Sequence, residues 1–195
     1  MQQGNLEHAH RLLGPRSAFV ILAPDRSGGW NAAPISNVTS ISVDPQIIAI
    51  ASYHKNKTSK LLKRFRPFVC CLMDANQLEA VWRSGGTYTG YDKIVGVERF
   101  GSEGLKLLWP ENSKTPVIEG SLAALSGRIV KKVRPGDHVV YFGRIYAAHF
   151  NPAAFSDEQI FDPAKFSPIL QVAGNLFCEV SKPRVIEYGP GKSRR

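Results

Sequence analysis

The sequence has few cysteines and no long apolar run, and each shortage excludes a class of protein. The three cysteines of this 195-residue chain, Cys70, Cys71 and Cys178, form no CxxC pair. An odd number of cysteines without metal or redox spacing is typical of buried thiols in a reducing compartment. The longest apolar runs, 18–23 and 47–51, are far shorter than the roughly 20 residues of a membrane-spanning helix. We therefore expect neither an integral membrane protein nor a membrane partner.

Three kinds of motif are also missing. Residues 1–16 contain charged side chains and no apolar stretch of the kind found in secretory signals, so we expect a cytoplasmic protein. His8 and His10 stand alone near the N-terminus without an HExxH or CxxC set, so we expect no metal site. No Gly-rich P-loop or GxGxxG motif is present, which argues against a nucleoside triphosphate site or a Rossmann site.

What the sequence does have is a local excess of positive charge. Lysine and arginine number 25 against 16 acids, for a net charge of +9. Residues 45–73 contain no acid, and the tail 189–195 is also basic. The cations of the first stretch are Lys55, Lys57, Lys60, Lys63, Arg64 and Arg66. Such local basicity indicates an anion site, whereas nucleic-acid binding stays a remote alternative because no aromatic residues interleave with these cations.

Strand-like segments dominate the chain. Strands are expected at 19–22, 32–42, 47–53, 68–73, 121–133, 139–150, 177–180 and 185–188. Helices are expected at 58–66, with Thr58 or Ser59 as the cap and Pro67 as the stop, and at 76–83. Residues 134–137 form a predicted hairpin turn, and 101–116 and 151–168 form predicted loops over the core or a partner subunit. This pattern predicts a mainly β protein, a small closed or partly open β-barrel with a few helices in one domain.

The end of the strand at 47–53 and the start of the following helix form the first candidate site. Free N–H groups and the positive end of the helix dipole favour an anion at such a junction. Hydroxyl and ammonium groups are available there to complete a phosphate cradle. They belong to Ser52, Thr58, Ser59, Lys55 and Lys57. The alternative interpretation is a capped surface helix with a solvated basic face.

The second candidate is the segment 30–45, where small and hydroxylated residues replace the large β-branched ones that strands favour. A flat ligand lying along this backbone would need small side chains beside it and polar groups aimed at its edge. An edge strand with one polar face is the alternative, and periodicity does not separate the two.

Short motifs follow one another along the chain: Asn31-x-x-Pro34-x-Ser36, Ser42-x-Asp44-Pro45, Lys55-x-x-Thr58, 82–86, Tyr91-Asp92-Lys93, 115–118, Gly136-Asp137-His138 and 174–177. Taken in this order, they resemble the flavin reductase-like family, flavoredoxins included. The resemblance covers roughly residues 12–182, leaving a basic tail at 189–195. Two positions depart from the family pattern: Phe177 stands where Tyr is usual, and Gln171 where Arg is common.

The resemblance implies an FMN-binding split barrel of Greek-key type that forms homodimers with FMN near the subunit interface. The isoalloxazine and ribityl groups would then face Ala33, Pro34, Ser36, Asn37, Val38, Thr39 and Ser40. The ribityl chain and phosphate would be held by Ser52, Tyr53, Lys55, Lys57 and Thr58. His138 would lie near the flavin as the one candidate catalytic residue, and Phe177 on the nicotinamide side of the cofactor site. A structural His138, bonded to a backbone carbonyl, is the alternative.

The implied activity is hydride transfer from NADH or NADPH to FMN, with electrons passed on to an acceptor, such as a partner protein. The main alternative is a flavoprotein that binds FMN without catalysis and carries electrons between partners. Heme binding in the same type of barrel is a remote alternative.

Overall fold

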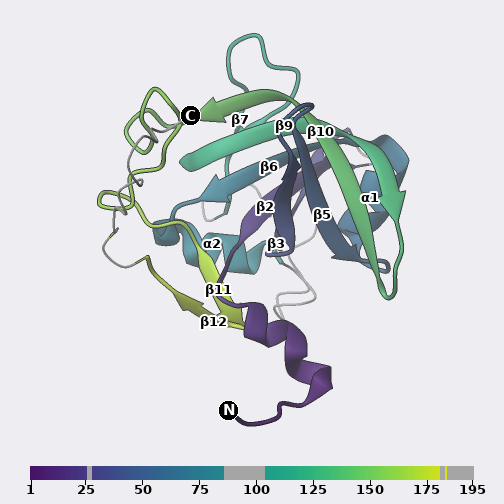
Figure 1. The fold of residues 1–195 in the computed structure, drawn as a ribbon. Coiled ribbons are helices and arrows are strands. Elements are labelled where there is room, and N and C mark those ends of the chain that lie inside the picture. The colour runs from purple at the N-terminus through teal and green to yellow at the C-terminus, as the bar shows by residue number, and fades with distance from the viewer. Residues whose placement is uncertain (26–27, 86–103, 181–182, 184–195) are drawn as a thin grey trace, which may run out of the picture.

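The computed structural model describes residues 1–25, 28–85, 104–180 and 183. Its centre is a seven-stranded antiparallel sheet in the order β3-β2-β6-β9-β10-β5-β4 (Figure 1). The strands are β2 (Phe19–Pro24), β3 (Trp30–Ile35), β4 (Val38–Ser42), β5 (Ile47–Tyr53), β6 (Pro67–Met73), β9 (Ser121–Val133) and β10 (His138–Phe150). The mainly β fold class predicted from the sequence is therefore confirmed.

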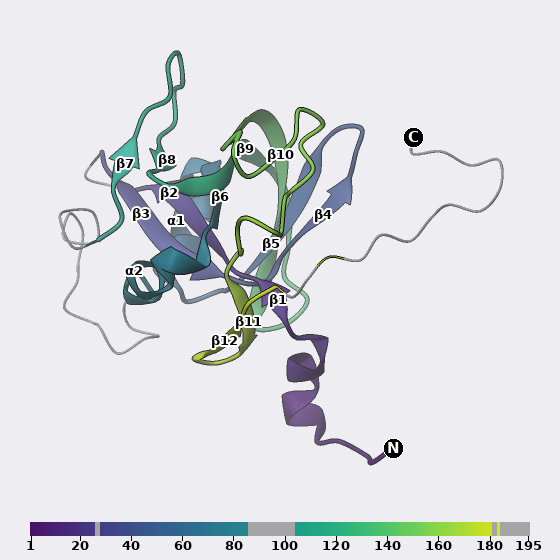
Figure 2. The ribbon, with the colours of Figure 1, turned by 90° about the vertical axis from the view of Figure 1, so that its left-hand side faces the viewer.

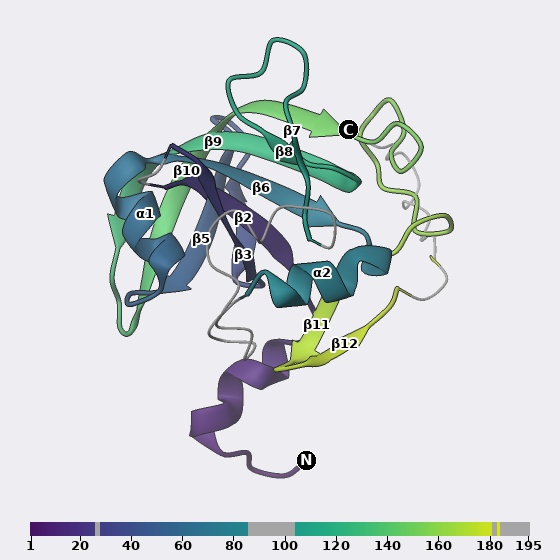
Figure 3. The same ribbon diagram turned by 180° about the vertical axis from the view of Figure 1, so that it is seen from behind.

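Two smaller sheets flank the large one. Strands β1 (Arg16–Ser17), β11 (Leu170–Ala173) and β12 (Leu176–Cys178) form a three-stranded sheet, and β7 (Leu107–Leu108) pairs with β8 (Val117–Ile118). The helices are η1 (Leu6–Leu13), α1 (Lys57–Phe65), η2 (Ala75–Gln77) and α2 (Leu78–Arg83). Figure 3 shows α2 beside β11 and β12, with α1 at the opposite side of the large sheet.

The prediction of one continuous strand at 32–42 was wrong, because the chain passes from one edge of the sheet to the other in the middle of this segment. Ile35 at the end of β3 pairs with Phe19 of β2, whereas Val38 at the start of β4 pairs with Ile50 of β5. Only Ser36 and Asn37 join these two edge strands. Two residues span less than about 10 Å, so the sheet has to curl until its edges meet. That curl closes the barrel.

Strand alternation produces two hydrophobic clusters, one on each face of the sheet. Cys70 lies in the cluster of Ile50, Phe68 and Tyr141, whereas Cys71 lies in the cluster that underlies α2. The prediction of buried thiols is confirmed for Cys70 and Cys71, which strand alternation places on opposite faces, whereas Cys178 is half-buried. Burial raises the pKa of Cys71 to about 11 and that of Cys70 well above its ordinary value, so both thiols stay protonated.

Other predictions met mixed outcomes. The long strands β9 and β10, their hairpin turn and the end of α1 before Pro67 are confirmed. The proposed caps were wrong: α1 begins at Lys57, its N-cap is Asn56, and Thr58 and Ser59 lie inside the helix. Exposed helix η1, which extends away from the barrel in Figure 2, was not expected, nor was β11. The strand expected at 185–188 lies outside the described residues.

Candidate functional site

The junction between β5 and α1 leaves helix N–H groups free. Asn56 has cap geometry, yet its side chain makes no capping hydrogen bond. The first backbone bond of the helix runs from Lys60 N–H to the carbonyl oxygen of Asn56, at 3.2 Å. Among the described residues, no acceptor meets the backbone N–H groups of Lys57, Thr58 and Ser59. Three donors at the positive end of the helix dipole are thus available to an anion.

Two buried hydrogen bonds hold the first turn of α1 in place. The Asn31 side-chain amide on β3 donates to Thr58 Oγ1 at 3.0 Å. From β10, the Tyr141 hydroxyl donates to the Ser59 carbonyl oxygen at 2.7 Å and lies 2.8 Å from Ser59 Oγ. Because the phenol proton is used on the carbonyl, the Ser59 hydroxyl donates to Tyr141. Burial raises the pKa of Tyr141, so it stays a neutral donor. Strands from both halves of the barrel therefore fix the free N–H groups in position.

The unpaired buried hydroxyl of Ser52 is the clearest indication of a ligand site at the junction. Its side chain is 3% exposed, and its Oγ has no hydrogen-bond partner among the described residues. A buried hydroxyl left unpaired costs about 1–3 kcal/mol, which a bound acceptor or donor would recover. Ser52 is followed directly by Tyr53, the last residue of β5. The residues present therefore suit a hydroxylated, anionic ligand chain at this end of the barrel.

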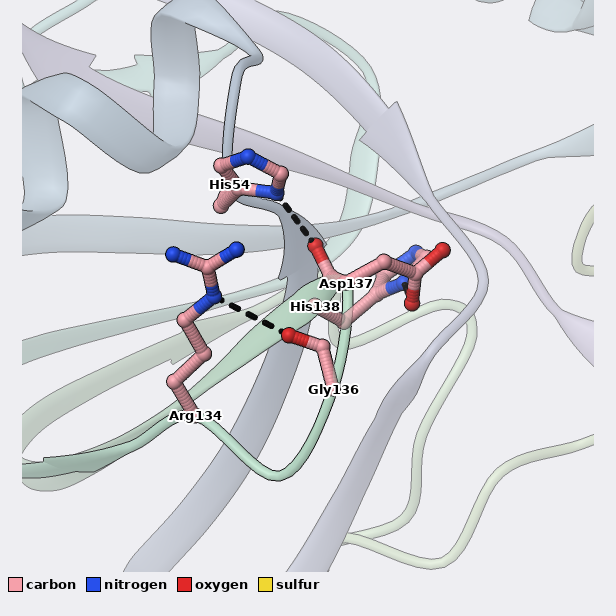
Figure 4. Close-up of polar contacts among 5 residues, drawn as sticks. All are labelled: His54, Arg134, Gly136, Asp137 and His138. Atoms are coloured by element: carbon pink, nitrogen blue, oxygen red, sulfur yellow. Dashed lines mark hydrogen bonds and ion pairs between the residues drawn. The ribbon is translucent and has the colours of Figure 1, made fainter.

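The hairpin between β9 and β10 lies against the same junction (Figure 4). The Asp137 carbonyl oxygen accepts from the backbone N–H of His54 at 3.1 Å and contacts His54 Nδ1 at 2.8 Å. Since a carbonyl only accepts, Nδ1 of His54 carries a proton. Arg134 Nε donates to the Gly136 carbonyl oxygen at 3.0 Å. These contacts anchor the start of β10, and with it His138, beside β5.

His138 is oriented by its neighbours. Its Nδ1 lies 2.7 Å from Asp137 Oδ1, and this hydrogen bond holds the pKa of Asp137 below its ordinary value. Tyr53 is its cross-strand partner, with ring centroids 5.9 Å apart. The contact of Nδ1 with a carboxylate leaves Nε2 as the ring nitrogen open to a ligand. A carboxylate, and not the backbone carbonyl of the alternative interpretation, is thus the partner of His138.

The crossover from β3 to β4 lies next to this junction. Asn37 accepts a hydrogen bond at its carbonyl oxygen from the Ala51 N–H, at 2.8 Å, and Ala51 precedes Ser52. The segments predicted to hold the ring and the phosphate therefore meet at the end of the antiparallel β4–β5 pair. Within the crossover group, Asn37, Thr39 and Ser40 are exposed and the other four residues are half-buried. Those four are Ala33, Pro34, Ser36 and Val38.

Phe177 does not join the junction. Its ring packs edge-on against Trp82, with centroids 5.7 Å apart, and contacts the hydrophobic cluster beneath α2. The two aromatic residues border an open hollow of about 500 Å³ whose other lining residues are Ala75, Asn76, Leu78, Glu79 and Asn175. Of the family segment around residues 82–93, the Ser84 hydroxyl donates to the Val81 carbonyl oxygen at the end of α2, and 91–93 lie outside the described residues.

Three residues of the site were missed by sequence reasoning: Asn31 as the partner of Thr58, Tyr141 as the partner of Ser59, and Arg16. Arg16 donates from Nη1 to Asn37 Oδ1 at 2.7 Å. It also pairs with Gln171 across β1 and β11, and Gln171 pairs with Phe177 on β12. No local pattern shows these contacts, because each depends on the pairing of strands distant in sequence.

With this geometry in place, comparison with known sequences identifies the class. The chain belongs to the flavin reductase-like domain family, whose sequence profile matches residues 14–182. The match agrees with the resemblance inferred from the motifs at the β3–β4 crossover and at the start of α1.

Solved structures share the fold. An FMN-binding protein from Thermus thermophilus, with bound 1-cyclohex-2-enone, is 19% identical with a TM-score of 0.78, covering 96% of this chain and 98% of that one. A split-barrel protein from Shewanella frigidimarina, assigned as a flavin reductase, is 15% identical with a TM-score of 0.79, covering 95% and 94%. An NADH:FAD oxidoreductase from Streptomyces globisporus is 18% identical with a TM-score of 0.73, covering 94% and 99%. The fold is thus the FMN-binding split barrel.

No helix among the described residues is long and apolar enough to span a membrane. No group of three or more potential metal ligands occurs in the same part of the chain.

Proposed function

We propose that this protein binds FMN and reduces it with NADH or NADPH, passing the electrons to a second acceptor. The proposal is supported by family membership and by one observation in particular: an uncapped helix start, fixed by buried hydrogen bonds, beside the unpaired buried hydroxyl of Ser52. Such a site suits the phosphate and ribityl hydroxyls of FMN.

Different residues of the chain contact different parts of FMN in this proposal. Lys57, Thr58 and Ser59 offer N–H groups to the phosphate, and Lys55 and Lys57 add positive charge. Ser52 offers its free hydroxyl to the ribityl chain. The crossover residues, from Ala33 to Ser40, lie along the ring, where small side chains and backbone amides allow close approach.

Bound FMN would supply the hydride-accepting and electron-donating chemistry. The chain binds and orients the two nucleotides, and His138, with its Nδ1 held by Asp137, can donate or accept a proton at Nε2. No other acid or base of the protein is required.

The visible spectrum of the purified protein, recorded before and after anaerobic addition of NADH or NADPH, tests the proposal. We expect FMN absorbance that bleaches rapidly with at least one of the two nucleotides. Bound FMN that is inert to both would overturn the reductase function and favour the electron carrier. A protein that binds no flavin would overturn both functions.

We also propose that the working form is a homodimer. A flat apolar ring at the rim of a small barrel needs a second surface to cover it, and the β4 edge of the barrel is exposed in one chain. Sedimentation at micromolar concentration is expected to give twice the chain mass. A monomer that binds FMN tightly would contradict the dimer without touching the proposed activity.

A further inference from the structure

One N–H donor of the Arg16 guanidinium has no acceptor among the residues that the structure describes. Its Nη1 is used by Asn37 Oδ1, but its Nε is buried and has no hydrogen-bond partner among the described residues. Nor does any described acid form an ion pair with it. A guanidinium is never deprotonated and only donates, so this arrangement leaves a positive charge and a shielded N–H uncompensated. Burying such a donor is costly unless an acceptor arrives.

The position of Arg16 indicates which acceptor. Its hydrogen bond reaches Asn37, in the middle of the crossover, and not the lysine-bearing start of α1. The Asn37 carbonyl oxygen in turn accepts a hydrogen bond from the N–H of Ala51, one residue before Ser52. The strand pairing of Arg16 with Gln171 fixes its backbone from the other side, and the Gln171 side chain is turned away to the Gly174 carbonyl. The guanidinium is therefore held at the ring-binding segment of the proposed FMN site.

Flavin chemistry supplies a group that fits. Hydride transfer from NAD(P)H brings two electrons and one proton to the ring system, which leaves one net negative charge. This charge is spread over the pyrimidine edge, where a nitrogen and neighbouring carbonyl oxygens are acceptors. A planar guanidinium matches two such acceptors side by side, whereas a lysine offers only a point charge.

We propose that Arg16 donates to the pyrimidine edge of the flavin and stabilises the reduced form more than the oxidised one. The inference rests on the proposed FMN function. It assigns to Arg16 a role that neither the phosphate cradle nor His138 fills: raising the reduction potential of the bound flavin. A residue that only tied β1 to the crossover would affect both redox forms equally.

The test compares Arg16→Gln with wild type by titrating oxidised and anaerobically reduced FMN. Arg16→Gln is expected to lose about tenfold more affinity for reduced FMN than for oxidised FMN. Tenfold corresponds to a potential about 30 mV lower for a two-electron couple, which a redox titration with reference dyes measures. Arg16→Lys, which keeps the charge, is expected to recover part of the difference. The matched control is Arg11→Gln, which removes an exposed charge from η1 and should change neither quantity.

Each other outcome has a distinct meaning. Equal losses for the two redox forms, or no loss in a variant whose circular dichroism matches wild type, would overturn the role of Arg16. A loss for FMN but not for riboflavin would place Arg16 at the phosphate and also overturn it. If Arg16→Gln unfolds, an unchanged affinity ratio in Arg16→Lys and in Arg16→His together would decide against the proposal. Wild-type protein that binds no FMN would refute the proposed function itself, and the inference with it.

Discussion

The first turns of η2 and α1 differ in whether a side chain accepts hydrogen bonds from their free backbone N–H groups. At the start of η2, which leads into α2, the Asp74 carboxylate accepts from the Asn76 N–H at 2.9 Å. At the start of α1, Asn56 makes no such bond, and no acid lies in the first turn. A side chain of the protein satisfies the first start, whereas the N–H groups of the second have no acceptor in the described part of the chain.

The difference shows how an incomplete helix end can persist. Helix α1 does not depend on its cap, because Leu61 and Leu62 are buried in the barrel core and Thr58 and Ser59 are tied to β3 and β10. Burying two leucines contributes several kcal/mol, more than the ~1 kcal/mol of a typical cap. Packing thus permits the N–H groups of α1 to be reserved for a ligand, while η2 uses a side chain that excludes an anion.

The largest expected effect is discrimination between FMN and riboflavin. If the α1 start holds the phosphate, two charge-assisted hydrogen bonds of about 1.5–3 kcal/mol each make FMN bind roughly 10²–10⁴ times tighter. Lys57→Ala, which removes a cation, and Thr58→Ala, which releases the helix start from the Asn31 amide, are each expected to weaken FMN and leave riboflavin nearly unchanged. Added salt should weaken FMN selectively. Titration followed by flavin fluorescence measures both ligands.

Two control variants sharpen that experiment. Lys63→Ala removes a charge from the last turn of the same helix and should leave both affinities in place. Thr58→Ser keeps the acceptor for the Asn31 amide and separates hydroxyl loss from the packing damage of Thr58→Ala. Equal binding of FMN and riboflavin by wild type would mean that the basic stretch is only a solvated helix face.

Asn56→Asp would make the start of α1 resemble that of η2. A carboxylate at this position would accept from the free N–H groups and repel the phosphate dianion, so FMN affinity is expected to fall about 10–100-fold while the melting temperature rises slightly. Calorimetric titration and thermal melting give the two quantities. Asn56→Ser, a neutral cap, should show a smaller loss, and a stabilised Asn56→Asp protein with unchanged FMN affinity would contradict the site.

Phe177→Tyr probes the aromatic hollow by Trp82 and not the helix start. If the hydroxyl usual in the family assists hydride transfer, the variant is expected to be reduced several-fold faster with little change in FMN affinity. Stopped-flow reduction by NADH or NADPH measures the rate. An unchanged rate would remove Phe177 from the active site, in line with its separation from the β5–α1 junction.

Asp74→Ala removes the side-chain cap from the start of η2. Loss of the bond to Asn76 is expected to cost about 1 kcal/mol, or about 2–4 °C in melting temperature for a protein of this size, with FMN binding unchanged. Thermal melting and the FMN titration are run on the same sample. A large fall in FMN affinity would show that the two helix starts are not independent.

The smallest effect concerns Asp137. Its pKa is lowered by the hydrogen bond to His138, so the folded protein gains stability above the ordinary aspartate pKa and loses it as pH falls through the lowered value. Asp137→Asn is therefore expected to lower the melting temperature slightly at pH values above the ordinary aspartate pKa and to match wild type at pH values below the lowered pKa. The pair is exposed, so a large effect would point to an additional partner.

Sequence patterns predicted much of the local structure and part of the site. The strand β5, the stop at Pro67 and the turn at 134–137 were predicted correctly, since each depends on neighbouring residues. The prediction of a single strand at 32–42 was wrong because the composition does not change at Ser36 and Asn37. There the chain leaves its pairing with β2 and begins to pair with β5. Phe177 was grouped with the cofactor residues by family pattern alone.

The sequence by itself determined the mainly β character, the burial of Cys70 and Cys71, and a basic, acid-free helix start after a buried strand. These follow from side-chain chemistry and from periods of two or four residues. Only the tertiary structure decided that Asn31 and Tyr141 hold that helix start, that the β3–β4 crossover lies beside Ser52, and that Arg16 Nε has no acceptor among the described residues. Those contacts join residues from 14 to more than 80 positions apart, and they depend on strand pairing and barrel closure.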